Sequence, residues 1–82
     1  MRIMTKTDYE IHRHEFSIGD GYIGIVEWTE NYEESTPRFF GTMYVTCEYA
    51  PGVVMYAELD EYFADRDDML KYVEDFIRRE YI

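Results

Sequence analysis

The chain has 82 residues, of which 46% are hydrophobic and 18% aromatic, so it is long enough for one folded core but too short for two. Eighteen Asp and Glu against eight Lys and Arg give a formal net charge of −10, which repels nucleic acid and anionic lipid and argues against direct binding to either. The lone cysteine, Cys47, excludes an internal disulfide, and no segment has the apolar run of a signal peptide or of a membrane-spanning helix. We therefore expect a single domain over residues 1–82, located in a reducing cytoplasm.

A hairpin is predicted at the start of the chain. Residues 9–18 and 22–29 are rich in aromatic and β-branched types, which favour strands, and Gly19-Asp20-Gly21 between them is typical of a tight turn. Residues 30–37 are polar and follow neither the strand nor the helix period, so they are predicted to form a loop. This loop gathers three carboxylates around one aromatic ring: Glu30, Glu33, Glu34 and Tyr32.

A second hairpin is predicted between residues 38 and 59. Residues 38–49 alternate between apolar and polar side chains, as in a strand with one buried face. Ala50-Pro51-Gly52 is predicted to turn the chain, and residues 53–59 then run back along the preceding strand. The apolar face holds Phe39, Met43, Val45 and Cys47, while Thr42, Tyr44, Thr46 and Glu48 share the other face.

A helix is predicted near the C-terminus. Asp65 is placed to cap it, with Asp68 three residues later, and acidic residues suit the positive end of the helix dipole. Apolar residues then recur at helical spacing and form one stripe, made of Met69, Leu70, Val73, Phe76, Ile77 and Tyr81. The sequence thus predicts an α+β domain, a four-stranded antiparallel meander (ββββα) whose C-terminal amphipathic helix packs on one sheet face.

Three polar residues on the first predicted strand form a candidate metal site. Glu10, His12 and His14 alternate, so their side chains would project from one side of the strand at steps of about 6.6 to 6.8 Å. Two histidines and a carboxylate can bind Zn²⁺ or Fe²⁺, but a lasting site also needs further ligands and supporting hydrogen bonds. An ordinary polar strand face explains the same residues, and we expect no bound metal.

No pattern in the sequence predicts an enzyme. Cys47 falls on an apolar strand face without an evident cationic neighbour, which is typical of a small buried residue rather than of a nucleophile. The acidic run that starts at Asp65 resembles the beginning of a calcium loop, yet Leu70 and Phe76 stand where such a loop needs Gly and Glu. No phosphate-binding glycine motif occurs. We expect neither catalysis nor a cofactor.

The acidity is the strongest functional signal in the sequence. Carboxylates on strands and loops can imitate the charges of a nucleic-acid backbone, so an acidic protein can occupy the Lys/Arg groove of a nucleic-acid-binding protein. Tyr side chains among the acids would serve as anchors, because Tyr is enriched where proteins meet. The predicted partner-binding residues are Glu27, Glu30, Tyr32, Glu33, Glu34, Tyr44, Glu48, Tyr56 and Glu58.

In size, acidity, absence of motifs and predicted meander-plus-helix order, the chain resembles the small phage-encoded inhibitors, especially the anti-CRISPR proteins. This resemblance implies a DNA-mimic inhibitor that acts in the host cytoplasm. Its partner would be a basic nucleic-acid-binding protein or complex, without direct contact to nucleic acid or membrane.

A non-enzymatic structural or adaptor domain is the alternative. In that case the acidity serves only solubility, and a homodimer would form through the Tyr-bearing sheet face or through an open sheet edge. The two hypotheses differ in the charge distribution that they predict. One contiguous negative patch favours the inhibitor, and an even spread favours the adaptor.

Overall fold

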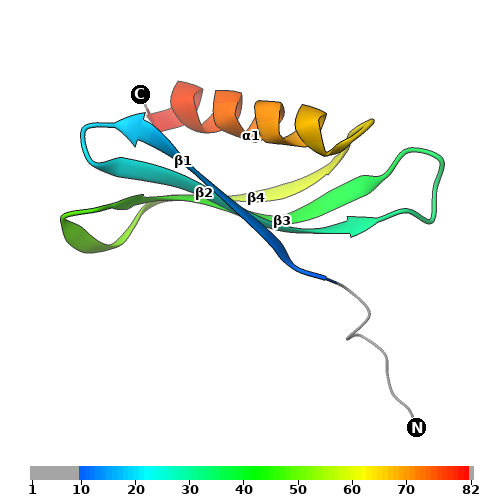
Figure 1. Cartoon of the computed structure of the whole chain (residues 1–82), viewed down its shortest axis with the longest axis horizontal. Helices are drawn as coiled ribbons and strands as arrows, with labels where there is room; N and C mark the ends of the chain where they lie inside the picture. The colour runs from blue at the N-terminus through cyan, green and yellow to red at the C-terminus, as the bar shows by residue number, and fades with distance from the viewer. Residues whose placement is uncertain (1–9, 82) are drawn as a thin grey trace, which may run out of the picture.

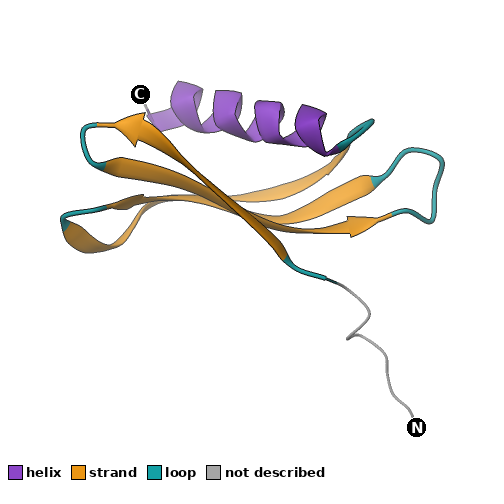
Figure 2. Ribbon diagram, viewed as in Figure 1, coloured by secondary structure: helices purple, strands orange, loops and turns teal. Residues whose placement is uncertain are grey.

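The computed structural model describes residues 10–81 and shows a twisted antiparallel sheet with one helix lying along it (Figure 1). The strands follow one another across the sheet in chain order. The predicted α+β architecture, a ββββα meander with the helix on one sheet face, is confirmed (Figure 2). The elements are β1 (His12–Gly19), β2 (Tyr22–Asn31), β3 (Arg38–Cys47), β4 (Ala50–Tyr62) and α1 (Arg66–Tyr81).

The first hairpin joins β1 and β2 at the predicted turn. All three residues of Gly19-Asp20-Gly21 have positive φ, with values of 99°, 56° and 80°, a backbone conformation that glycine adopts without steric cost. β1 begins at His12. Tyr9, the predicted first residue of this strand, lies outside the described residues.

β2 extends two residues further than the sequence predicts. Glu30 pairs with Phe39 of β3, and Asn31 pairs with Arg38, so the ladder continues into the polar segment that was expected to be a loop. Cross-strand pairing here overrides the local preference of polar residues for a loop. The connection between β2 and β3 is therefore confined to residues 32–37.

The second hairpin turns earlier than predicted. The chain reverses at Glu48 and Tyr49, where the backbone N–H of Glu48 donates to the carbonyl oxygen of Gly21 at 2.7 Å. The prediction of a turn at Ala50-Pro51-Gly52 was wrong, because these residues begin β4. The pairing of β4 with β3 shifts register around Thr46, and Gly52 has a φ of 112°, so irregular pairing on this edge strand accommodates the proline and the glycine.

The start of α1 confirms the predicted cap. The backbone N–H of Asp68 donates to Oδ1 of Asp65 at 2.9 Å, which satisfies an amide that the first helical turn leaves without an intrahelical partner. Leu70 and Phe76 are half-buried at the margins of the apolar stripe, and the side chain of Tyr81 lies outside the described part of the chain. The centre of the stripe is fully buried and consists of Met69, Val73 and Ile77.

The hydrophobic core lies between α1 and one face of the sheet. Alternate residues of each strand contribute to it, as the period of two predicts. Phe39 has no exposed surface and meets the ring of Phe63 edge-on, with 5.6 Å between the ring centroids. The strand residues of the core are Ile18, Val26, Trp28, Phe39, Met43, Val45 and Leu59.

Two glycines permit close packing within the sheet. A Cβ on Gly41 would lie 2.7 Å from the Cα of Trp28 and closer still to the carbonyl oxygen of Glu27, so β2 and β3 can approach there only because Gly41 lacks a side chain. A Cβ on Gly24 would lie 2.6 Å from the ring of Phe16, its cross-strand partner. The Phe16 ring therefore takes the space above Gly24.

Candidate functional site

The sheet face that points away from α1 is covered by no other element among residues 10–81 (Figure 2). We call it the uncovered face. The strand register arranges its side chains in rows that cross the sheet. Arg13, Glu27, Thr42 and Glu58 form one row, the acidic row, and Glu15, Ile25, Tyr44 and Tyr56 form the next, the aromatic row.

The aromatic row combines a buried aliphatic residue with an exposed ring. Tyr44 and Tyr56 are cross-strand partners, which confirms that they share the face opposite the helix. Ile25 is only 5% exposed, although it points away from the core under α1. Neighbouring side chains therefore close over Ile25, while Tyr56 remains 61% exposed and available for contact.

The acidic row retains an excess of negative charge. Nε of Arg13 donates to the carboxylate of Glu27 at 3.2 Å, and Nη1 of Arg13 donates to the carboxylate of Glu15 in the adjacent row. The hydrogen bond to Glu15 is the main reason that the pKa of Arg13 is raised. One arginine thus serves two carboxylates. Glu58 is exposed and has no charged partner within residues 10–81.

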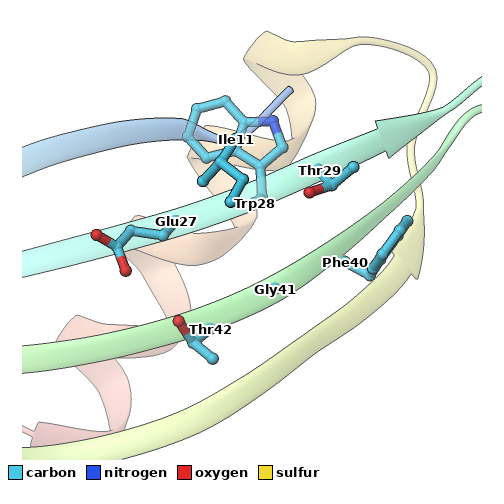
Figure 3. A pocket seen from close by; sticks show the side chains of 7 residues that line it. All are labelled: Ile11, Glu27, Trp28, Thr29, Phe40, Gly41 and Thr42. Carbon is cyan, nitrogen blue, oxygen red and sulfur yellow. The ribbon is translucent and has the colours of Figure 1, made fainter. Parts of the chain in front are cut away.

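An open hollow of about 210 Å³ lies beside the acidic row (Figure 3). Figure 3 shows Glu27 and Thr42 at one end of it and Phe40 at the other, with Gly41 between them. The guanidinium carbon of Arg38 lies 4.6 Å from the ring centroid of Phe40, and Nε of Arg38 is 2.8 Å from the carboxylate of Asp60. The residues that line the hollow are Ile11, Glu27, Trp28, Thr29, Phe40, Gly41 and Thr42.

Glu30 lies apart from the uncovered face and has three partners. Its side chain is 5% exposed and accepts hydrogen bonds from Nε of Arg66 at 2.7 Å, from Nε1 of Trp28 at 2.8 Å and from the hydroxyl of Tyr32 at 2.5 Å. The bond from Arg66 is the largest cause that lowers the pKa of Glu30 to about 2. This predicted partner-binding carboxylate already holds together β2, the following loop and the start of α1.

The loop of residues 32–37 presents the remaining predicted residues of that segment. Tyr32 is 64% exposed, and its hydrogen bond to Glu30 raises its pKa. Glu33 and Glu34 are exposed, and the backbone N–H of Glu33 donates to Oδ1 of Asn31 at 2.9 Å. This bond orders the start of the loop and leaves the carboxylate of Glu33 without a partner among the described residues.

The nine predicted partner-binding residues fall in three places. Glu27, Glu58 and the two tyrosines of the aromatic row share the uncovered face. Residues 30–34 lie at the end of the sheet where β2 passes into β3. Glu48 is exposed in the turn between β3 and β4, at the opposite end of β3.

Two acidic segments that are distant in sequence meet at one end of the molecule. The backbone N–H of Phe63 donates to the carbonyl oxygen of Pro37 at 3.1 Å, and the hydroxyl of Tyr62 donates to Glu34 at 3.3 Å. Residues 30–38 and 60–68 together hold eight carboxylates and two arginines, a formal charge of −6. We call this region the acidic end. The partner-binding residues predicted from the sequence do not include the carboxylates of residues 60–68, although their density is visible in the sequence.

The histidines of the candidate metal site stack on aromatic rings. The His12 ring lies 5.3 Å from the Trp28 ring, and the His14 ring lies 6.2 Å from the Phe16 ring, both measured between centroids. Glu10 places Oε1 3.8 Å from Nε2 of His12. Within residues 10–81, no group of three or more His, Cys, Asp or Glu side chains is arranged to hold a metal ion.

No helix within residues 10–81 has the length and hydropathy needed to cross a bilayer.

A family model described as a family of unknown function, DUF5487, matches residues 11–80. A protein of Enterobacteria phage T4, described as an uncharacterized 8.2 kDa protein in the Gp46-Gp47 intergenic region, is 44% identical over 64 residues, which covers 78% of this chain and 88% of the phage protein. No solved structure matches. The expected similarity to small phage-encoded proteins is thereby supported.

Proposed function

We propose that this chain, which belongs to the DUF5487 family of unknown function, is a phage-encoded, non-enzymatic inhibitor that binds a basic protein and occupies its nucleic-acid-binding surface. In this proposal the protein is a DNA mimic of the anti-CRISPR kind. It acts on its partner in the host cytoplasm and touches neither nucleic acid nor membrane.

The uneven distribution of charge carries this proposal. The acidic end has a formal charge of −6, while the whole chain has −10. A concentrated negative surface attracts basic protein surfaces and raises the rate at which they associate. The distribution of charge over the chain is therefore closer to the contiguous patch expected of an inhibitor than to the even spread expected of an adaptor.

The ion pairs of the protein favour a basic partner over nucleic acid. Arg13, Arg38, Arg66 and Arg78 each have a nitrogen within 4 Å of a carboxylate of the same chain. Binding to a phosphate backbone requires cations that are free to replace counterions. Within residues 10–81, most arginines already pair with carboxylates, whereas several exposed carboxylates have no cationic partner there.

Exposed tyrosines supply the second component of a protein-binding surface. Tyr32 stands at the acidic end, and Tyr56 stands on the uncovered face. Tyr62 is 50% exposed and links the two regions, because it continues the uncovered face on β4 and bonds to Glu34. Large rings surrounded by charge are typical of the anchors of protein interfaces.

The test uses a charge reversal at the acidic end and a matched reversal elsewhere. Wild type, Glu33→Lys/Glu34→Lys and Asp75→Lys/Glu80→Lys would be immobilised and used to capture proteins from host cell extract. All four positions are exposed, and both variants change the net charge equally. Proteins retained by wild type and by the helix variant, but lost from the loop variant, are then identified and purified.

The captured protein must also lose nucleic-acid binding when the chain is added. We expect duplex DNA or RNA to displace this chain from the captured partner, and this chain to displace the nucleic acid, because the two compete for one surface. A captured partner that binds nucleic acid and the chain simultaneously would overturn the inhibitor proposal. Retention by both charge-reversal variants alike would remove the acidic end as the contact surface.

The adaptor function is the second candidate, and the uncovered face favours it. Tyr56 and Tyr44 lie side by side on that face, which a second copy of the chain could cover. The formal charge of −10 on each copy opposes such a dimer. Sedimentation equilibrium at low and high salt separates the cases, since a dimer through this face would strengthen as salt screens the repulsion.

A further inference from the structure

The hollow on the uncovered face has the size of one long side chain. Its volume of about 210 Å³ corresponds to roughly seven water molecules and is below the 300 to 1,000 Å³ of usual small-molecule sites. A cofactor or metabolite would therefore remain largely outside it. A single side chain of a partner protein would fill it.

The walls of the hollow are apolar, and one end of its rim is acidic. Ile11 and Phe40 contribute hydrocarbon and ring surface, and Glu27 contributes a carboxylate at the end near Thr42 (Figure 3). Thr42 is the cross-strand partner of both Glu27 and Glu58, so a glutamate stands beside Thr42 on each neighbouring strand. The hollow thus offers an apolar lining that ends at a paired negative charge.

The charge at this end remains available in spite of Arg13. Nε of Arg13 bonds to one oxygen of Glu27 at 3.2 Å, while Nη1 of the same guanidinium bonds to Glu15. The other oxygen of Glu27 and the carboxylate of Glu58 have no hydrogen-bond donor within residues 10–81. A further cation can therefore enter without displacing Arg13.

We infer that the hollow is a subsite for one arginine side chain of a basic partner, an assignment that rests on the proposed function. The methylene stem of the arginine lies along Ile11 and Phe40, and its guanidinium reaches Glu27, Thr42 and Glu58. Arginine suits the site because a planar guanidinium donates to several oxygens at once and is more weakly hydrated than an ammonium group. The subsite would fix one point of contact with the partner on the uncovered face. Diffuse attraction to the acidic end does not fix such a point.

A short peptide tests the subsite without the partner. A blocked Gly-Gly-Arg-Gly-Gly peptide would be titrated into isotope-labelled protein at low salt and followed by heteronuclear NMR. The same peptide with citrulline in place of arginine keeps the shape and removes the charge. We expect the arginine peptide to shift the amide signals of Glu27, Gly41, Thr42 and Glu58, and the citrulline peptide to shift them much less.

Two conservative variants show whether the rim carboxylates are responsible. Glu58→Gln should weaken binding of the arginine peptide about two- to fivefold, as for a partly exposed ion pair. Glu33→Gln removes another exposed carboxylate, at the acidic end, and should leave the affinity at the hollow unchanged. Equal shifts with arginine and citrulline, or shifts centred on residues 30–38 and 60–68, would overturn the assignment.

The experiments distinguish failure of the arginine subsite from failure of the inhibitor function. If the peptide binds in the hollow but no captured partner competes with nucleic acid, the subsite stands and the inhibitor function fails. If a competing partner is found and binds Glu58→Gln as tightly as wild type, the function stands and the subsite is wrong.

Discussion

Nε of Arg66, at the first residue of α1, lies 2.7 Å from the carboxylate of Glu30 near the end of β2. This ion pair connects residues that are 36 positions apart and closes the acidic end around a buried carboxylate. The ion pair holds the end of β2 against the start of α1, within one of the most acidic parts of the chain.

The first prediction concerns the pH dependence of stability. The pKa of Glu30 is lowered to about 2, chiefly by Arg66, so the stabilisation from its ionised form is complete above its ordinary pKa near 4.5 and is lost as pH falls through about 2. Glu30→Gln should lower the free energy of unfolding by up to about 3 kcal/mol near neutral pH, less where solvent screens the half-exposed Arg66. Denaturant titrations between pH 7 and pH 2 should show this difference shrinking with acidity. A difference that stays constant would contradict the assignment.

The second prediction concerns the face of α1 that packs on the sheet. Ile77 has no exposed surface, so Ile77→Ala should lower the free energy of unfolding by about 2 to 5 kcal/mol. Phe76 is half-buried and stacks on Tyr72 at 6.2 Å between centroids, so Phe76→Ala should cost less than Ile77→Ala. Asp75→Ala, on the outer face, is the control and should change stability by less than about 0.5 kcal/mol. The reverse order for Ile77 and Phe76 would mean that the helix is rotated on the sheet.

The third prediction separates two kinds of crowding around glycine. Gly41→Ala would press a Cβ against the backbone of Trp28 and Glu27, and Gly24→Ala would press one against the ring of Phe16. Each should cost about 1 to 3 kcal/mol, with Gly41→Ala the more severe because backbone cannot rotate away. Thermal unfolding of the single variants and of Gly24→Ala/Phe16→Leu provides the measurement. The smaller Leu side chain should recover part of the Gly24→Ala loss, and failure to do so would show that the ring is not the obstacle.

The fourth prediction concerns association with the partner once it is identified. Glu33→Lys/Glu34→Lys should slow association and flatten its salt dependence, because attraction between exposed charges is screened beyond about 8 Å at physiological ionic strength. Glu30 is left intact in this variant, since its carboxylate is bonded to Arg66. Stopped-flow or biosensor rates at several salt concentrations would be compared with those of Asp75→Lys/Glu80→Lys. Identical rates for the two variants would assign the steering to another surface.

The sequence predicts those parts of the fold that depend on neighbours in the chain. Alternation along residues 38–49 correctly places Met43 and Val45 in the core and Tyr44 on the opposite face, because side chains alternate in any strand. The aspartates before α1 likewise locate its start, since a cap acts over three residues. Both signals are complete within one short window.

The parts that the sequence did not predict depend on contacts between distant residues. Glu30 stands in a polar run without a period, and only its pairing with Phe39 and its bond to Arg66 show that it belongs to β2 and is buried. Ala50-Pro51-Gly52 has the composition of a turn, but pairing with β3 extends β4 through it. The hollow depends on Ile11 just before β1, on Glu27 of β2 and on Phe40 of β3, whose combination no local pattern encodes.

The nearest-neighbour order of the four strands has a consequence for how the chain reaches its native state. Each strand can pair with the strand before it once a loop of only a few residues has closed, so the loss of loop entropy at each step is small. From β2 onward each strand pairs with a strand that is already made, and α1 completes the core last. Among sheet-rich domains, such short-range connectivity favours rapid folding, so the inner strands β2 and β3 spend little time unpaired and available for aggregation.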